Sequence, residues 1–74
     1  MEDDLVKQTC ARFNISPKFF GVVCYRLSET LMPHMTPVER VELMFSWTRV
    51  FCDLDTNTQQ KLIAEVRAEQ SVPY

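Results

Sequence analysis

Glycine and histidine are scarce in this sequence, and their scarcity excludes several kinds of catalytic site. The 74 residues include one glycine, Gly21, and one histidine, His34. A phosphate-binding loop needs several glycines, and the zinc-protease motif H-E-x-x-H needs two histidines. His34 lies in a short connection flanked by prolines, where a histidine is usually a plain solvent-exposed residue. We therefore expect no catalytic residues, no enzyme activity and no small-molecule substrate.

Closely spaced cysteines are also missing. The three cysteines, Cys10, Cys24 and Cys52, lie far apart in the sequence. Structural zinc sites normally use close pairs such as C-x₂₋₄-C, and an odd count without short spacings does not indicate a disulfide framework. Each cysteine has apolar neighbours, so we expect buried, unreactive thiols that pack as small hydrophobic residues. No metal site and no cofactor is predicted.

The chain lacks both an excess of basic residues and a long apolar run. Eight Lys and Arg residues stand against ten Asp and Glu residues, for a net charge of −2, whereas dedicated nucleic-acid binders are usually basic. No run approaches the about 18 apolar residues that cross a bilayer. The segment Met1–Asp4 is acidic, unlike the start of a signal peptide. We expect a cytoplasmic protein with no membrane partner.

Large apolar side chains, by contrast, are abundant. Hydrophobic residues make up 46% of the chain, with five Phe, two Tyr and one Trp among them. A domain of this size buries only roughly 60% of its unfolded surface, so its core has little room for so many rings. Either some rings lie exposed, or a second chain covers them. We therefore expect another protein as partner, in a homodimer or a hetero-complex.

Apolar residues recur at helical spacing in four segments separated by helix breakers. The expected helices are about residues 4–13, 17–31, 37–53 and 58–70. Ser16 followed by Pro17 marks the second start, and Thr36 with Glu39 forms a capping box at the third. We predict an all-α fold in which residues 1–74 form one domain, a compact bundle of four short helices.

The third predicted helix is apolar on two sides. One stripe consists of Val41, Met44, Phe45, Thr48 and Cys52, and the other of Leu43, Trp47, Val50 and Leu54. A helix that is apolar on two sides contacts neighbours on both. We therefore expect this helix at the centre of the bundle, with one stripe available to a second chain.

The segment from Lys7 to Arg26 has the spacing of a helix-turn-helix motif. Cys10 is the small residue of the first helix, and the turn residue Asn14, the aliphatic Ile15 and the cap Ser16 follow. If the motif reads DNA, the contacts would come from the start of the second helix. The candidate DNA-binding residues are Ser16, Lys18, Phe19 and Arg26. Because basic side chains are few there, DNA binding is the alternative hypothesis.

Apolar residues on the outer faces of the second and third helices predict a protein-binding surface. The candidate partner-binding residues are Phe19, Val22, Tyr25, Leu43, Trp47 and Val50. Aromatic residues often carry much of the energy at such interfaces. We expect a small non-enzymatic regulator or inhibitor that docks a helical face on a partner protein, of a size and class typical of phage or mobile-element proteins. The alternatives are a helix-turn-helix transcriptional regulator and an assembly or secretion chaperone.

Overall fold

A computed structural model describes residues 2–70, and every regular element in that range is helical. The elements are α1 (Glu2–Phe13), α2 (Pro17–Leu31), α3 (Pro37–Glu42), the 3₁₀ helix η1 (Met44–Trp47), α4 (Thr48–Asp53) and α5 (Thr56–Gln70). The predicted all-α compact fold is confirmed. Three of the predicted segments match α1, α2 and α5 with boundaries that agree to within two residues.

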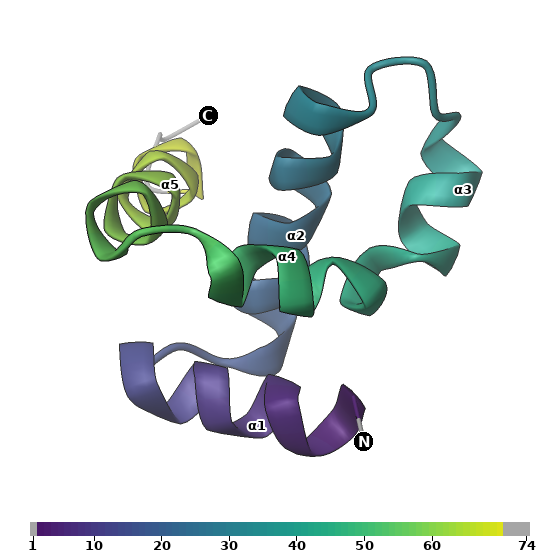
Figure 1. Ribbon diagram of the computed structural model, residues 1–74. Coiled ribbons are helices and arrows are strands. Elements are labelled where there is room, and N and C mark those ends of the chain that lie inside the picture. The colour runs from purple at the N-terminus through teal and green to yellow at the C-terminus, as the bar shows by residue number, and fades with distance from the viewer. Residues whose placement is uncertain (1, 71–74) are drawn as a thin grey trace.

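The central element is α2, not the segment 37–53 as expected. All the other helices pack against α2 (Figure 1): α1 crosses its N-terminal end, α3 and α5 lie on opposite sides, and η1 and α4 run across it. The side chains of Phe20, Val23 and Cys24 are fully buried there. The sequence of α2 is apolar around most of its circumference, which allows it to contact neighbours in several directions.

The single helix predicted over 37–53 is divided into α3, η1 and α4. Leu43 ends α3 with φ −101° and ψ 11°, and a 3₁₀ turn follows. The turn brings Met44 and Phe45 against Gly21 of α2. A Cβ atom built at position 21 would lie 2.9 Å from Met44 Cε and 3.7 Å from Phe45 Cζ. Glycine therefore permits this close approach, and packing against α2 overrides helix continuity in the segment.

Aromatic rings fill the core instead of lying on the surface. Phe51 and Phe20 are fully buried in an edge-to-face pair with centroids 5.3 Å apart, and Phe13 meets Phe51 at 5.7 Å. The remaining described rings, Phe19, Tyr25, Phe45 and Trp47, are half-buried. The expectation that rings would be left exposed is therefore wrong for residues 4–70. The large apolar side chains that do lie exposed are aliphatic or Met.

Side-chain caps fix where the helices begin. Ser16 Oγ accepts from the Phe19 N–H at 3.0 Å, as the predicted cap of α2 should. The capping box of α3 is complete: Thr36 Oγ1 accepts from the Glu39 N–H at 3.2 Å, and Glu39 Oε1 accepts from the Thr36 N–H at 3.0 Å. At the start of α5, the Asp55 carboxylate accepts from the Thr58 N–H at 3.2 Å.

Candidate protein-docking surface

The short helix α3 packs against α2 through a charged residue and leaves its valines in solvent. Arg40 is 5% exposed, and its Nη1 donates a hydrogen bond to Ser28 Oγ of α2 at 3.1 Å. Val38 and Val41, one helical turn apart and therefore on one face, are 66% and 59% exposed. A surface helix usually turns its apolar face to the core. The orientation of α3 is the reverse.

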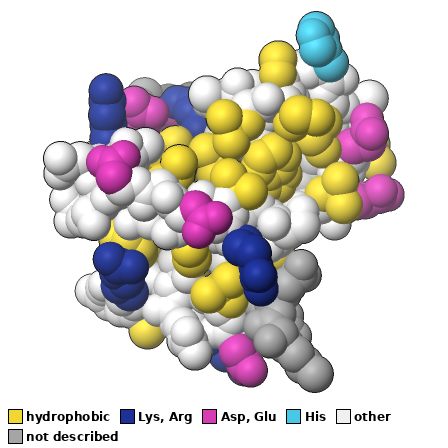
Figure 2. All heavy atoms as spheres, viewed as in Figure 1, with side chains coloured by type: hydrophobic (Ala, Val, Ile, Leu, Met, Phe, Trp, Pro, Cys, Tyr) yellow, Lys and Arg dark blue, Asp and Glu magenta, His cyan; other side chains and the backbone are white. Residues whose placement is uncertain are grey.

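More exposed apolar residues flank α3 at both ends. Leu31 and Met32 end α2, and Leu43 follows α3, and each is about half exposed. We call these three residues, together with Val38 and Val41, the α3 surface. Figure 2 shows hydrophobic side chains gathered over α2 and toward α3. Exposed large apolar side chains gathered in one part of a surface often mark an interaction site.

A shallow hollow lies on α3 itself. Its lining consists of Pro37, Val38, Val41 and Glu42, so it is apolar with one carboxylate at its edge. Hollows lined in this way accept apolar side chains, and a few polar groups orient what binds.

The carboxylates beside the α3 surface make its border acidic. Glu39 and Glu42 on α3 are exposed, and Figure 2 shows acidic side chains next to hydrophobic ones at this edge. The backbone N–H and the hydroxyl of Thr36 donate to the Glu39 carboxylate and hold its pKa below the ordinary value. Glu39 is therefore ionised at neutral pH. The one basic residue of α3, Arg40, is buried.

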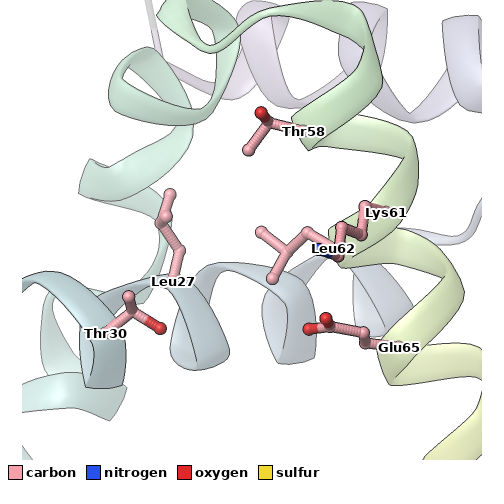
Figure 3. Close-up of a pocket in the computed structure, with 6 residues that line it drawn as sticks. All are labelled: Leu27, Thr30, Thr58, Lys61, Leu62 and Glu65. Carbon is pink, nitrogen blue, oxygen red and sulfur yellow. The ribbon is translucent and has the colours of Figure 1, made fainter.

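A second groove runs between α2 and α5, and it is more polar. Its lining residues are Leu27 and Thr30 of α2 and Thr58, Lys61, Leu62 and Glu65 of α5. In Figure 3, Leu62 extends from α5 toward Leu27, while Lys61 and Glu65 lie along α5 on the other side of the groove. The charged side chains and the hydroxyls make this groove a weaker candidate for apolar docking.

The structure separates the predicted partner-binding residues. Phe19 and Val22 line one hollow with Ser16, Lys18 and Gln70 near the end of α5. Leu43 belongs to the α3 surface, whereas Val50 is exposed on α4. Tyr25 and Trp47 are half-buried, and Trp47 packs against the core. Three of the six residues, Val22, Leu43 and Val50, are exposed, and of these Leu43 belongs to the α3 surface.

The predicted corner between the first two helices is present. Asn14 adopts the left-handed conformation with φ 54°, and the Ile15 N–H donates to the Cys10 carbonyl at 3.0 Å. Asn14, Ile15 and Ser16 thus form the tight turn that joins α1 to α2.

The C-terminal part of α5 engages two of the four DNA-binding candidates. Arg26 forms an ion pair with Glu69, and the Arg67 guanidinium lies over the Phe19 ring, 5.6 Å from its centroid. Ser16 and Lys18 stay exposed at the start of α2. The face of α2 that would read bases is therefore partly covered by α5.

Sequence reasoning missed four residues of the α3 surface: Leu31, Met32, Val38 and Val41. Val41 belongs to one of the two apolar stripes predicted for residues 37–53, without a prediction of which stripe is exposed, and the structure exposes it together with Leu31. On a helix, the sequence Pro37-Val-Glu-Arg-Val-Glu42 does place the two valines on one face and Arg40 outside that face. Periodicity distinguishes the two faces of a helix but does not say which face packs against the rest of the protein. The sequence therefore shows that the valines share a face, but not that this face is exposed.

Cys10 and Cys24 are buried as predicted, whereas Cys52 is partly exposed. Burial raises the pKa of the Cys24 thiol to about 12. In the part of the chain that the structure describes, no three His, Cys, Asp or Glu residues gather as metal ligands would. No described helix combines the length and the apolar character needed to cross a bilayer.

Comparison with known protein families, with curated proteins and with solved structures finds no match. Function is therefore inferred from the surface itself.

Proposed function

We propose that this chain is a small protein-binding regulator that docks its α3 surface onto a partner protein. The observation that carries the proposal is the orientation of α3, which buries Arg40 and exposes Val38 and Val41. Full burial of one valine side chain is worth about 1.5 kcal/mol. A partner that covers both valines would recover free energy that the isolated chain leaves unused.

The α3 surface is held in a defined position, which favours binding. The capping box of Thr36 and Glu39 fixes the start of α3, and the hydrogen bond from Arg40 to Ser28 ties the helix to α2. A surface that is already ordered loses less conformational entropy when it binds. We infer docking of a helix face, in which two valines one turn apart act as anchors.

The activity that we propose is occupation of the partner's surface, as a regulator or inhibitor, without catalysis. An assembly chaperone would use the same α3 surface, and the identity of the partner distinguishes the two roles. The helix-turn-helix hypothesis has less support, because α5 engages Phe19 and Arg26 and because the net charge is −2.

The test compares Val41→Asp with Val50→Asp. Each immobilised variant and the wild type would be incubated with lysate of the source cells, and retained proteins would be identified by mass spectrometry. The retained protein is then purified, and its dissociation constant is measured by calorimetry. We expect Val41→Asp to weaken binding at least roughly tenfold, the factor that about 1.4 kcal/mol corresponds to.

Val50→Asp is the matched control, because Val50 is an exposed valine on α4, outside the α3 surface. We expect it to bind as the wild type does. A partner whose affinity falls with Val50→Asp and not with Val41→Asp would contradict the proposal, since the docking face would then be on α4. Melting curves followed by circular dichroism confirm that both variants fold.

A further inference from the structure

The charges around the α3 surface have one sign. Glu39 and Glu42 are both exposed on α3. The only basic side chain of α3 belongs to Arg40, which is buried with its Nη1 directed to Ser28. Whatever covers the valines therefore brings its own charged groups close to carboxylates.

The hollow on α3 adds a more specific constraint. Val38 and Val41 offer apolar contacts, and Glu42 places a carboxylate at the same hollow. Lys and Arg have apolar stems and charged ends, so one such side chain can lie along valines while its charged end reaches a carboxylate. Acidic side chains from a partner would be repelled at the same position.

A second copy of this chain is a poor fit to the same surface. In a two-fold symmetric dimer the same patch faces itself. Two α3 surfaces in contact would place Glu39 and Glu42 of both copies in the same interface. Like charges in close contact oppose association.

On these grounds, and given the proposed function, we propose that the α3 surface binds a basic amphipathic segment of its partner. Apolar side chains of that segment, spaced one helical turn apart, cover Val38, Val41 and Leu43. Lys or Arg residues beside them pair with Glu39 and Glu42. The charged pairs determine the orientation of the segment and favour basic partners over acidic ones.

The test uses a random-peptide phage library panned on the full chain, followed by calorimetry with the selected synthetic peptides. We expect these peptides to combine apolar residues at helical spacing with an excess of Lys and Arg. Glu42→Lys should weaken their binding roughly fivefold to tenfold, because the ion pair between Glu42 and a basic residue of the peptide is replaced by repulsion between two positive charges. Added salt should weaken the binding to the wild type as well.

Two further variants keep the experiment decisive. Glu65→Lys makes the same charge change on α5, across α2 from α3, and should leave affinity within roughly twofold. Val38→Asp should abolish binding of the selected peptides. It places an acid in the first turn of α3, where negative charge suits the helix dipole, so the variant should fold.

The outcomes separate this inference from the proposed function. If the selected peptides are acidic or uncharged but still lose affinity with Val38→Asp, the inference of a basic partner is wrong. The proposal that the α3 surface docks a partner would then still hold. Self-association that Val38→Asp abolishes, without binding of basic peptides, overturns the inference in favour of a second copy. If neither peptide binding nor self-association depends on Val38, the proposed function falls with it.

Discussion

Replacing Arg40 with alanine should destabilise the protein more than replacing Val41 with alanine. In an ordinary amphipathic helix the ranking is the opposite, because valines are buried and arginines are exposed. Here Arg40 is 5% exposed and Val41 is 59% exposed. The comparison therefore tests the orientation of α3 directly, on two adjacent positions of one helix.

The expected magnitudes follow from burial. Val41→Ala removes two methyl groups, and burial of each is worth about 0.8 kcal/mol when it is complete. Because Val41 is mostly exposed, less than half of that free energy is lost, and we expect a destabilisation of about 0.5 kcal/mol. Arg40→Ala removes the packed apolar stem of the side chain and the hydrogen bond to Ser28, and both changes destabilise the folded state. Part of this loss is offset, because the folded state no longer has to desolvate a guanidinium group. We expect a net loss of about 1.5 kcal/mol.

Arg40→Met separates the two contributions. Methionine keeps an apolar stem of similar length and removes the hydrogen bond to Ser28 Oγ, so we expect a loss below about 1 kcal/mol. The Ser28 hydroxyl keeps its own hydrogen bond to the Tyr25 carbonyl at 2.6 Å, so the serine is not left without a partner. The loss for Arg40→Met should therefore fall below that for Arg40→Ala.

The measurement is urea unfolding followed by circular dichroism and by Trp47 fluorescence, with amide hydrogen exchange as a local probe. The Leu43 N–H donates to the Glu39 carbonyl at 3.0 Å and reports the opening of α3. Its exchange should accelerate most in Arg40→Ala. If Val41→Ala costs as much free energy of unfolding as Arg40→Ala, α3 packs through its valines and the reasoning is refuted.

The remaining predictions concern the ionisable side chains of Glu39 and Cys24. The pKa of Glu39 is lowered from 4.5 by hydrogen bonds from Thr36, so its stabilisation is present above pH 4.5 and is lost as pH falls through the lowered value. Glu39→Gln, which cannot titrate, should flatten the acid side of a plot of melting temperature against pH; parallel curves would contradict this. Burial raises the pKa of Cys24 to about 12, so its stabilisation is complete below pH 9.0 and declines as pH rises from there. Cys24→Ala should weaken that alkaline decline in stability. Iodoacetamide should modify Cys24 far more slowly in the native protein than in the unfolded chain, which peptide mass spectrometry can measure. Equal rates of modification would exclude a buried thiol.

Helix starts were predictable because they depend on neighbouring residues. The capping side chains bond to groups within one turn of the same helix, as Ser16 does at the start of α2 and as Thr36 and Glu39 do at the start of α3. The all-α fold followed from the same local patterns.

The break after α3 was not predictable, because it depends on a distant contact. No proline or glycine interrupts residues 38–53, and the turn forms where Met44 packs against Gly21. The direction of α3 depends likewise on Ser28, which provides the acceptor for Arg40. Of the candidate site, Leu43 was identified from the sequence. Val38 and Val41 were missed, since helical periodicity cannot say which face another helix will cover.

The contact between Gly21 and Met44 has a consequence for how the domain responds to changes in its interior. Met44 begins η1, and η1 follows α3 with only Leu43 between them. A Cβ atom added at position 21 would lie 2.9 Å from Met44 Cε, which is the end of a flexible side chain. Methionine has three rotatable bonds, so Met44 can move its terminal methyl group aside. The methionine therefore absorbs a change at position 21 before that change reaches the backbone of η1 or the residues of the α3 surface.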